Sequence, residues 1–128
     1  MTYHLAIDVG ASSGRFILGN LNKKIELEEI YRFENGIEFN GEYHVWNLDK
    51  LFDNIICGLK VCKNIGKIPS TIAIDTWGVD YVLMKGDMEI LPCVSYRDVR
   101  TLTTPQEVFE IIPNEKLYSN TGDRKSVV

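Results

Sequence analysis

Long hydrophobic runs are absent from this 128-residue sequence. No stretch approaches the roughly 18 consecutive apolar residues that indicate a membrane-spanning helix. The first residues, Met1 to His4, carry neither the basic segment nor the apolar core of an export signal. We therefore expect no membrane partner and a cytoplasmic location.

Positive charge is also scarce. The 14 lysines and arginines are outnumbered by 18 aspartates and glutamates, which gives a formal net charge of −4. Binding to nucleic acid depends on clustered basic residues that neutralise phosphates. The composition therefore disfavours a nucleic-acid partner and confines any anionic ligand to a local site, and it leaves the oligomeric state open.

Cysteine and histidine are few. The three cysteines, Cys57, Cys62 and Cys93, form no Cys-x-x-Cys pair and are odd in number, which is typical of reduced thiols. We expect all three to be packing residues and predict no catalytic thiol. The two histidines, His4 and His44, lack the spacing of metal ligands.

The composition, 45% hydrophobic and 25% charged, is typical of a globular domain, and its patterning predicts a β-β-β-α-β unit. The first two strands are expected around residues 5–7 and 16–18. Alternation over 25–33 predicts a third strand. Four of its residues are expected to share one face, namely Ile25, Leu27, Tyr31 and Phe33. The apolar run over 71–75 predicts a buried fourth strand.

The helix of this unit is expected to begin after Asn47 or Asp49 as its cap and to end at Gly66. Its apolar residues recur at the i, i+3, i+4 spacing of one helix face: Leu48, Leu51, Phe52, Ile55, Ile56, Leu59 and Cys62. The Asn-Gly pairs between 35 and 41 are typical of a loop, and 42–46 of a short extended piece.

Farther along the chain, strands are predicted over 81–85 and 88–91 around a turn at Gly86 and Asp87. Thr104, followed by a proline and then a glutamate three residues after it, predicts the cap of another helix.

The run Asp8-Val9-Gly10-Ala11-Ser12-Ser13-Gly14-Arg15 lies between two apolar segments and predicts a strand, a glycine-rich turn and a second strand. An aspartate that ends a strand can hold a hydrated cation, and glycines and serines bring N–H groups and hydroxyls against phosphate oxygens. The run differs from a P-loop, because no Gly-Lys-Ser/Thr follows, and from a dinucleotide-binding motif, because a strand follows its second glycine.

Two further strings leave functional and structural interpretations open. Asp75-Thr76-Trp77-Gly78-Val79-Asp80 suits a polyol that stacks on indole and bonds to carboxylates, or a tight turn beside a core tryptophan. Tyr96-Arg97-Asp98-Val99-Arg100 suits a ligand contact or a surface ion-pair cluster.

Taken together with Arg-Phe-Glu-Asn-Gly at 32–36, these strings resemble the N-terminal portion of the FGGY family of carbohydrate kinases, and within it the branch that phosphorylates rhamnulose. The resemblance implies an α/β fold of the actin/hexokinase/Hsp70-like (ribonuclease H-like) type, present here as an incomplete N-terminal domain with a mixed sheet and helices. It implies ATP and Mg²⁺ as cofactors and a small sugar as the partner.

The implied reaction is ATP-dependent phosphorylation of L-rhamnulose to L-rhamnulose 1-phosphate in L-rhamnose catabolism. Other ketose or polyol kinases of the same family, acting on fuculose or xylulose, are the alternative. A ribonuclease H-like metal-dependent nuclease with carboxylates at Asp8 and Asp75 is a remote alternative, disfavoured by the Ser-Ser-Gly-Arg loop and the acidic charge balance.

The resemblance also assigns residues. Asp8 matches the metal-binding aspartate, and Gly78 matches a sugar-contacting position, to which we add the neighbours Trp77, Asp80 and Arg97. The ATP-phosphate loop matches Ala11, Ser12, Ser13, Gly14 and Arg15. No catalytic residue is assigned, because the family's general-base aspartate has no counterpart in this chain.

We expect residues 1–122 to form a partial N-terminal kinase domain and to be inactive alone. Residues 123–128 depart from the family pattern and correspond to one translation of a common sequencing adapter. We expect these six residues to be a non-native tail.

Overall fold

A computed structural model describes residues 2–122, which divide into two compact units. One unit contains the chain up to Gly36 together with Asn47–Gly78, and the other contains Ile37–Trp46 together with the chain from Val79 onward. The expected tail at 123–128 lies outside the described residues.

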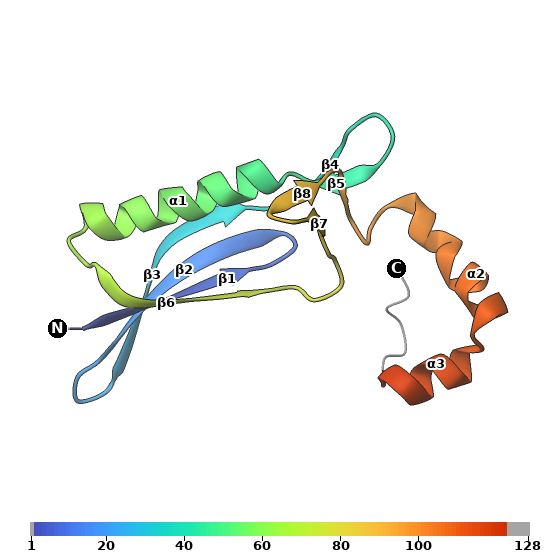
Figure 1. Ribbon diagram of the computed structural model, residues 1–128. Coiled ribbons are helices and arrows are strands. Elements are labelled where there is room, and N and C mark those ends of the chain that lie inside the picture. Colours follow the sequence, from blue (N-terminus) through green and yellow to red (C-terminus); the bar gives the residue numbers. More distant parts are fainter. Residues whose placement is uncertain (1, 123–128) are drawn as a thin grey trace. The chain divides into compact units, whose positions relative to one another are not determined.

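The first unit is built on a four-stranded mixed sheet (Figure 1). Its strands are β1 (Tyr3–Val9), β2 (Ser13–Leu21), β3 (Ile25–Glu34) and β6 (Pro69–Thr76), in the order β3-β2-β1-β6. β1 pairs antiparallel with β2 and parallel with β6. Helix α1 (Leu48–Asn64) precedes β6 and lies along one face of the sheet, so the predicted β-β-β-α-β unit is confirmed.

Helix α1 has the predicted cap and the predicted end. The Asn47 side chain accepts a hydrogen bond from the Lys50 backbone N–H at 3.0 Å, and Gly66 has the left-handed φ of 70° that suits glycine after a helix. Phe52 is an exception on the expected apolar face, because it is 60% exposed. The core between helix and sheet contains Leu5, Ile7, Val9, Phe16, Leu18, Phe33 and Cys62.

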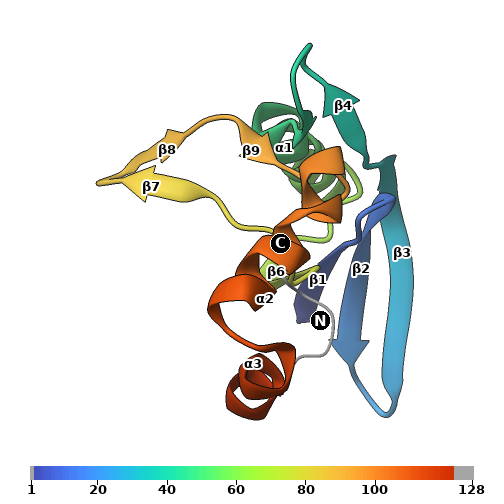
Figure 2. The same cartoon turned by 90° about the vertical axis from the view of Figure 1, so that its right-hand side faces the viewer.

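The expectation that four residues of β3 share one face is wrong. The register changes from Phe16↔Tyr31 to Ile17↔Glu29, so Ile30 is an additional residue in β3. Such a bulge moves the side chains beyond it to the other face of the sheet. Phe33 is therefore buried with the core, whereas Leu27 is 70% exposed. Figure 2 shows β1, β2 and β3 side by side.

The expectation that the fourth strand is buried is also wrong. β6 is the last strand in the order of the sheet, and β1 is its only partner among the described residues. Ile72 and Ile74 are 51% and 57% exposed. An apolar run is typical of a buried strand only where elements cover the strand, and its pattern does not determine how many neighbours the strand has.

The second unit contains short elements. β4 (Ile37–Phe39), β5 (His44–Trp46) and β9 (Cys93–Val94) form one small sheet, and β7 (Leu83–Lys85) pairs with β8 (Met88–Ile90) as predicted. A 3-10 turn η1 (Val99–Leu102) leads to α2 (Thr104–Ile111) and α3 (Asn114–Thr121).

Two expectations for this unit need correction. β4 lies in the segment predicted as a loop, where pairing with β5 outweighs the composition of the flanking Asn-Gly pairs. Thr104 is not the cap of α2: the helix includes it, Thr103 precedes it, and the Thr104 hydroxyl donates to the Arg100 carbonyl at 2.9 Å.

All three cysteines are free thiols, as expected. Cys62 and Cys93 are buried, whereas Cys57 is exposed on α1 and is not a packing residue. Within residues 2–122, no helix has the length and apolar content needed to cross a membrane.

Candidate functional site

The glycine-rich run forms the predicted strand-turn-strand hairpin. β1 ends at Val9 and β2 begins at Ser13, with Val9 opposite Gly14. The Gly10 N–H donates to the Ser13 carbonyl at 2.9 Å and closes the turn. The residues assigned to the phosphate loop therefore lie in this turn and at the beginning of β2.

Asp8 and Arg15 face each other across the base of the hairpin. The Arg15 guanidinium donates from Nε and from a terminal nitrogen to one Asp8 carboxylate oxygen, each at 2.8 Å. Ile7 and Val9 point into the core, so strand alternation places Asp8 on the opposite face of the sheet. The side chains are 46% and 47% exposed, and exposed pairs contribute about 1 kcal/mol or less. A ligand with stronger charge can replace this pair.

A row of charged residues crosses the sheet at this level. Asp75 on β6 is in register with Asp8, and Arg32 on β3 is in register with Arg15. Glu29 accepts from Arg32 at 2.9 and 2.7 Å. This contact raises the pKa of Arg32 and lowers the pKa of Glu29. The Asp8 and Asp75 carboxylates thus lie beside the guanidiniums of Arg15 and Arg32, an arrangement that suits a hydrated cation next to phosphate oxygens.

Asn35, which directly follows β3, contacts the hairpin through two donors. Its backbone N–H donates to the Ser12 carbonyl at 3.0 Å, and its side-chain Nδ2 donates to the Gly10 carbonyl at 2.9 Å. The sequence alone did not single out this residue, although it belongs to the Arg-Phe-Glu-Asn-Gly string. An asparagine directly after a strand is a recognisable signal for side-chain bonds to a nearby backbone.

Trp77 and Gly78 follow β6 in the same unit. Trp77 is half-buried and packs against the core, in agreement with the structural interpretation of its string. A Cβ atom built on Gly78 would meet no heavy atom within 4 Å. Packing therefore does not require glycine at this position, which leaves room for a ligand to approach the backbone.

Asp80 and Arg97 belong to the second unit, where both contact Tyr96. The Asp80 carboxylate accepts from the Tyr96 N–H and from the Trp46 indole N–H, each at 2.7 Å and each on a different oxygen. The Arg97 Nε donates to the Tyr96 hydroxyl at 2.8 Å, and the guanidinium lies 5.2 Å from the centre of that ring. Both Asp80 oxygens thus bond to neighbouring residues of the unit.

Asp98 lies at the centre of the Tyr96–Arg100 string, and the expectation of a surface cluster is wrong for this residue. Its side chain is only 2% exposed. It accepts from the His44 backbone N–H at 2.6 Å and from the Arg100 backbone N–H at 3.1 Å. These two bonds lower the pKa of Asp98, and the bond from His44 has the larger effect. The position of Asp98 directly before η1 is the sequence signal of a helix cap.

No group of three or more histidine, cysteine, aspartate or glutamate side chains is arranged to hold a metal within residues 2–122. A cation at Asp8 would therefore depend on ligand phosphates and water for most of its coordination. Mg²⁺ is commonly bound in this way, through one or two carboxylates.

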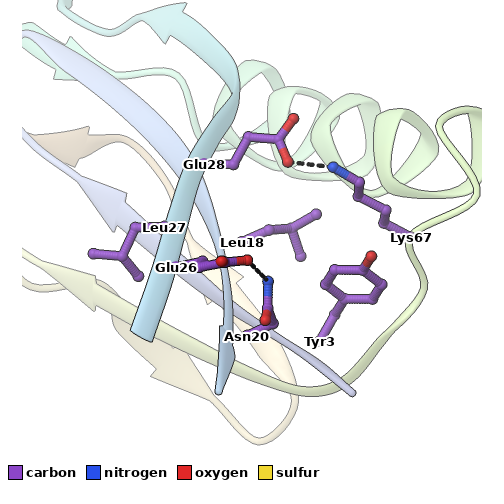
Figure 3. A pocket seen from close by; sticks show the side chains of 7 residues that line it. All are labelled: Tyr3, Leu18, Asn20, Glu26, Leu27, Glu28 and Lys67. Atoms are coloured by element: carbon purple, nitrogen blue, oxygen red, sulfur yellow. Dashed lines mark hydrogen bonds and ion pairs between the residues drawn. The ribbon is translucent and has the colours of Figure 1, made fainter. Parts of the chain in front are cut away.

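A cavity of about 320 Å³ lies elsewhere in the first unit (Figure 3). Its lining residues are Tyr3, Leu18, Asn20, Glu26, Leu27, Glu28 and Lys67. Tyr3 pairs with Asn20 at the opposite end of β1 and β2 from the hairpin. The cavity is therefore not part of the candidate phosphate site.

Comparison with known proteins matches residues 3–126 to the N-terminal domain of the FGGY family of carbohydrate kinases. The chain is 51% identical to a rhamnulokinase of Halalkalibacterium halodurans over 124 residues, 95% of this chain and 26% of that protein. It is 45% identical to a rhamnulokinase of Oceanobacillus iheyensis, over 93% of this chain and 26% of that protein. A Bacillus subtilis rhamnulokinase is 42% identical over 93% of this chain and 25% of its own length. The chain thus spans about a quarter of these relatives.

Proposed function

The chain belongs to the FGGY family of carbohydrate kinases, and on that premise we propose that it forms part of an ATP-dependent kinase that phosphorylates L-rhamnulose to L-rhamnulose 1-phosphate. The relatives named above carry the name rhamnulokinase. L-rhamnose catabolism in the cytoplasm is the process this activity would serve. Residues 1–122 would be a partial N-terminal domain of the actin/hexokinase-like, ribonuclease H-like type, which the sheet order β3-β2-β1-β6 supports.

The hairpin with Asp8 and Arg15 at its base is the observation that carries this proposal. Its peptide groups and hydroxyls from Ala11 to Ser13 lie in a turn next to a carboxylate and a guanidinium. Phosphoryl transfer depends mainly on positioning and on neutralising phosphate charge. Arg15 would bind a phosphate oxygen once its bond to Asp8 is released, and Asp8 would hold the metal directly or through water.

The cofactor requirement follows from the same residues. Mg²⁺, when bound, supplies positive charge to the terminal phosphates of ATP. The carboxylate of Asp8 is the donor type that Mg²⁺ prefers, and the carboxylate oxygen that Arg15 does not contact leaves a position for a water ligand. No residue of this chain is proposed as the general base for the sugar hydroxyl.

On the sugar side, Gly78 would let the ketose approach the backbone, with Trp77, Asp80 and Arg97 as neighbouring candidates. Asp80 would act mainly by holding Tyr96, because both its carboxylate oxygens already bond within its unit, and Arg97 bonds to the same residue through its Nε. Fuculose and xylulose are less favoured substrates, since the relatives named above are rhamnulokinases. The nuclease alternative is not favoured either.

A titration of the ¹⁵N-labelled chain with Mg·ATP tests the nucleotide site. We expect the amide signals of residues 8–15 to shift with saturation, and Arg15→Gln to weaken binding by about tenfold, because a charged hydrogen bond contributes about 1.5 kcal/mol or more. Lys23→Gln, an exposed change at the opposite end of β2, is the matched control for charge. Saturating nucleotide that leaves the signals of 8–15 unmoved would overturn the proposal.

A coupled ADP assay tests the activity. The 128 residues alone are expected to give no turnover with L-rhamnulose and Mg·ATP, because they lack a proposed general base. Sustained ADP release by these residues would contradict this expectation. In the longer kinase, Gly78→Ala should raise KM for the ketose and leave KM for ATP unchanged, since the added methyl meets no protein atom within 4 Å.

A further inference from the structure

We propose that Asn35 is a positioning residue of the phosphate hairpin, which fixes the direction of two peptide groups so that their N–H groups point away from β3 and toward a bound phosphate. This inference rests on the proposed function, and it concerns a residue to which no role has been given above.

The geometry begins with two carbonyls of the turn. The Gly10 carbonyl accepts from Asn35 Nδ2 at 2.9 Å, and the Ser12 carbonyl accepts from the Asn35 backbone N–H at 3.0 Å. The single residue that follows β3 therefore holds alternate carbonyls of the turn on the same side. The side chain is half-buried, so water competes weakly for the Gly10 bond.

The planarity of the peptide bond gives this contact its consequence. In a trans peptide the C=O and the N–H of the same unit point in opposite directions. Because the Gly10 carbonyl points toward Asn35, the Ala11 N–H of the same peptide unit points away from Asn35. The Ser12 carbonyl also points toward Asn35, so the Ser13 N–H points away from it as well. The N–H groups of Ala11 and Ser13 are thereby directed away from the β3 side of the turn.

Asn35 can act in this way because the end of β3 is anchored. Phe33 is 7% exposed, and its ring occupies the space where a Cβ of Gly14 would lie. The pairs Gly14↔Phe33 and Ser13↔Glu34 continue the ladder up to Asn35. The hairpin is therefore bonded on one side to a fixed strand. The Ala11 and Ser13 N–H groups are oriented before phosphate binds, so they need no rearrangement when it does.

The backbone bond and the side-chain bond can be separated by mutation. Asn35→Leu keeps the backbone N–H and nearly the same side-chain size but removes the donor to Gly10. Asn35→Ser is a second variant, neutral and too short to reach Gly10, in case the leucine disturbs folding. Asn22→Leu is the matched control, because Asn22 is exposed at the other end of the β2–β3 pair and is bonded there through its backbone.

The experiment titrates the ¹⁵N-labelled chain and each variant with Mg·ATP and with inorganic triphosphate, following the amides of residues 8–15. The free energy of unfolding is measured in parallel. We expect both Asn35 variants to bind each phosphate compound about fivefold more weakly or worse, the size of one neutral hydrogen bond, and Asn22→Leu to bind as the unchanged chain does. The triphosphate arm isolates the phosphate contact from the nucleoside.

The outcomes separate the two proposals. Binding by the unchanged chain together with Asn35 variants within twofold of it would overturn the role of Asn35 and leave the proposed function intact. A loss of stability in these variants without a loss of affinity would also overturn it. If the unchanged chain binds neither compound at 8–15, the phosphate site itself is wrong, and the role of Asn35 is overturned with it.

Discussion

At the scale of single residues, Gly14 is the position where a side chain is least compatible with the hairpin. A Cβ there would lie 2.1 Å from the Phe33 Cζ atom and 2.2 Å from Cε1. Phe33 is buried in the core and cannot move aside without disturbing its neighbours. The glycine is therefore required by the packing of β3 against β2, whether or not its backbone also contacts phosphate.

Gly14→Ala is accordingly expected to destabilise the chain by about 1–3 kcal/mol, the usual cost of overpacking a core. Urea denaturation followed by circular dichroism measures this. Gly36→Ala is the control, because a Cβ there meets nothing within 4 Å. Equal stabilities for the two variants would contradict the packing explanation.

Asp98 carries a buried, hydrogen-bonded carboxylate in the second unit. The backbone N–H groups of His44 and Arg100 bond to the carboxylate and lower its pKa below the ordinary value of 3.8. A carboxylate with a lowered native pKa stabilises the fold above its unfolded pKa, and this contribution disappears as the pH falls through the native pKa.

The stability of the unchanged chain should therefore fall as the pH drops below the unfolded value of 3.8. Asp98→Asn should be less stable at neutral pH and show a smaller fall, because it cannot be protonated. Urea midpoints between about pH 2 and pH 6 test this. Parallel pH profiles for the two proteins would refute the role of the ionised carboxylate.

At the scale of elements, α1 packs against the sheet through a buried glycine, Gly58. A Cβ on Gly58 would lie 2.4 Å from two atoms of the Phe16 ring, and Phe16 is fully buried. Alanine is the better helix former by about 1 kcal/mol, whereas overpacking costs about 1–3 kcal/mol. Packing should outweigh helix propensity at this position.

Gly58→Ala is thus expected to lower the free energy of unfolding by up to about 2 kcal/mol, the difference between these two effects. Cys57→Ala, at the exposed neighbouring position of the same helix, should change it by no more than about 0.5 kcal/mol. Thermal and urea unfolding of the two variants provide the comparison. A more stable Gly58→Ala variant would show that the ring can move away.

At the scale of the whole molecule, β6 is an unprotected edge of the sheet. Within residues 2–122 it has one partner strand, and its Ile72 and Ile74 are half exposed. An edge strand with apolar side chains and free backbone groups favours pairing between chains. The net charge of −4 opposes association only weakly.

We expect the 128-residue chain to self-associate as its concentration rises, and Ile72→Lys to reduce this association. The lysine moves the net charge toward zero and so weakens the repulsion between chains. Charge repulsion alone therefore predicts more self-association, not less. Leu21→Lys makes the same charge change at a residue 72% exposed at the end of β2. Sedimentation velocity of the three proteins measures the effect, and an equal reduction by both lysines would exclude the β6 edge as the cause.

Elements that depend on nearby residues could be predicted from the amino-acid sequence. The cap at Asn47, the apolar spacing of α1 and the glycine turn after β1 are local, because each is set by residues within a few positions of one another. The order of these elements also predicted the β-β-β-α-β unit, since a parallel strand needs a crossover connection.

Which surfaces are covered and which distant groups meet could not be predicted in this way, because both depend on long-range contacts. The bulge at Ile30 reverses the faces of β3, and the position of β6 at the edge exposes an apolar strand. Asn35 bonds to Gly10 across 25 positions of sequence, and Asp98 bonds to His44 across 54. Such contacts depend on how strands align in space, and a local pattern carries no information on that alignment.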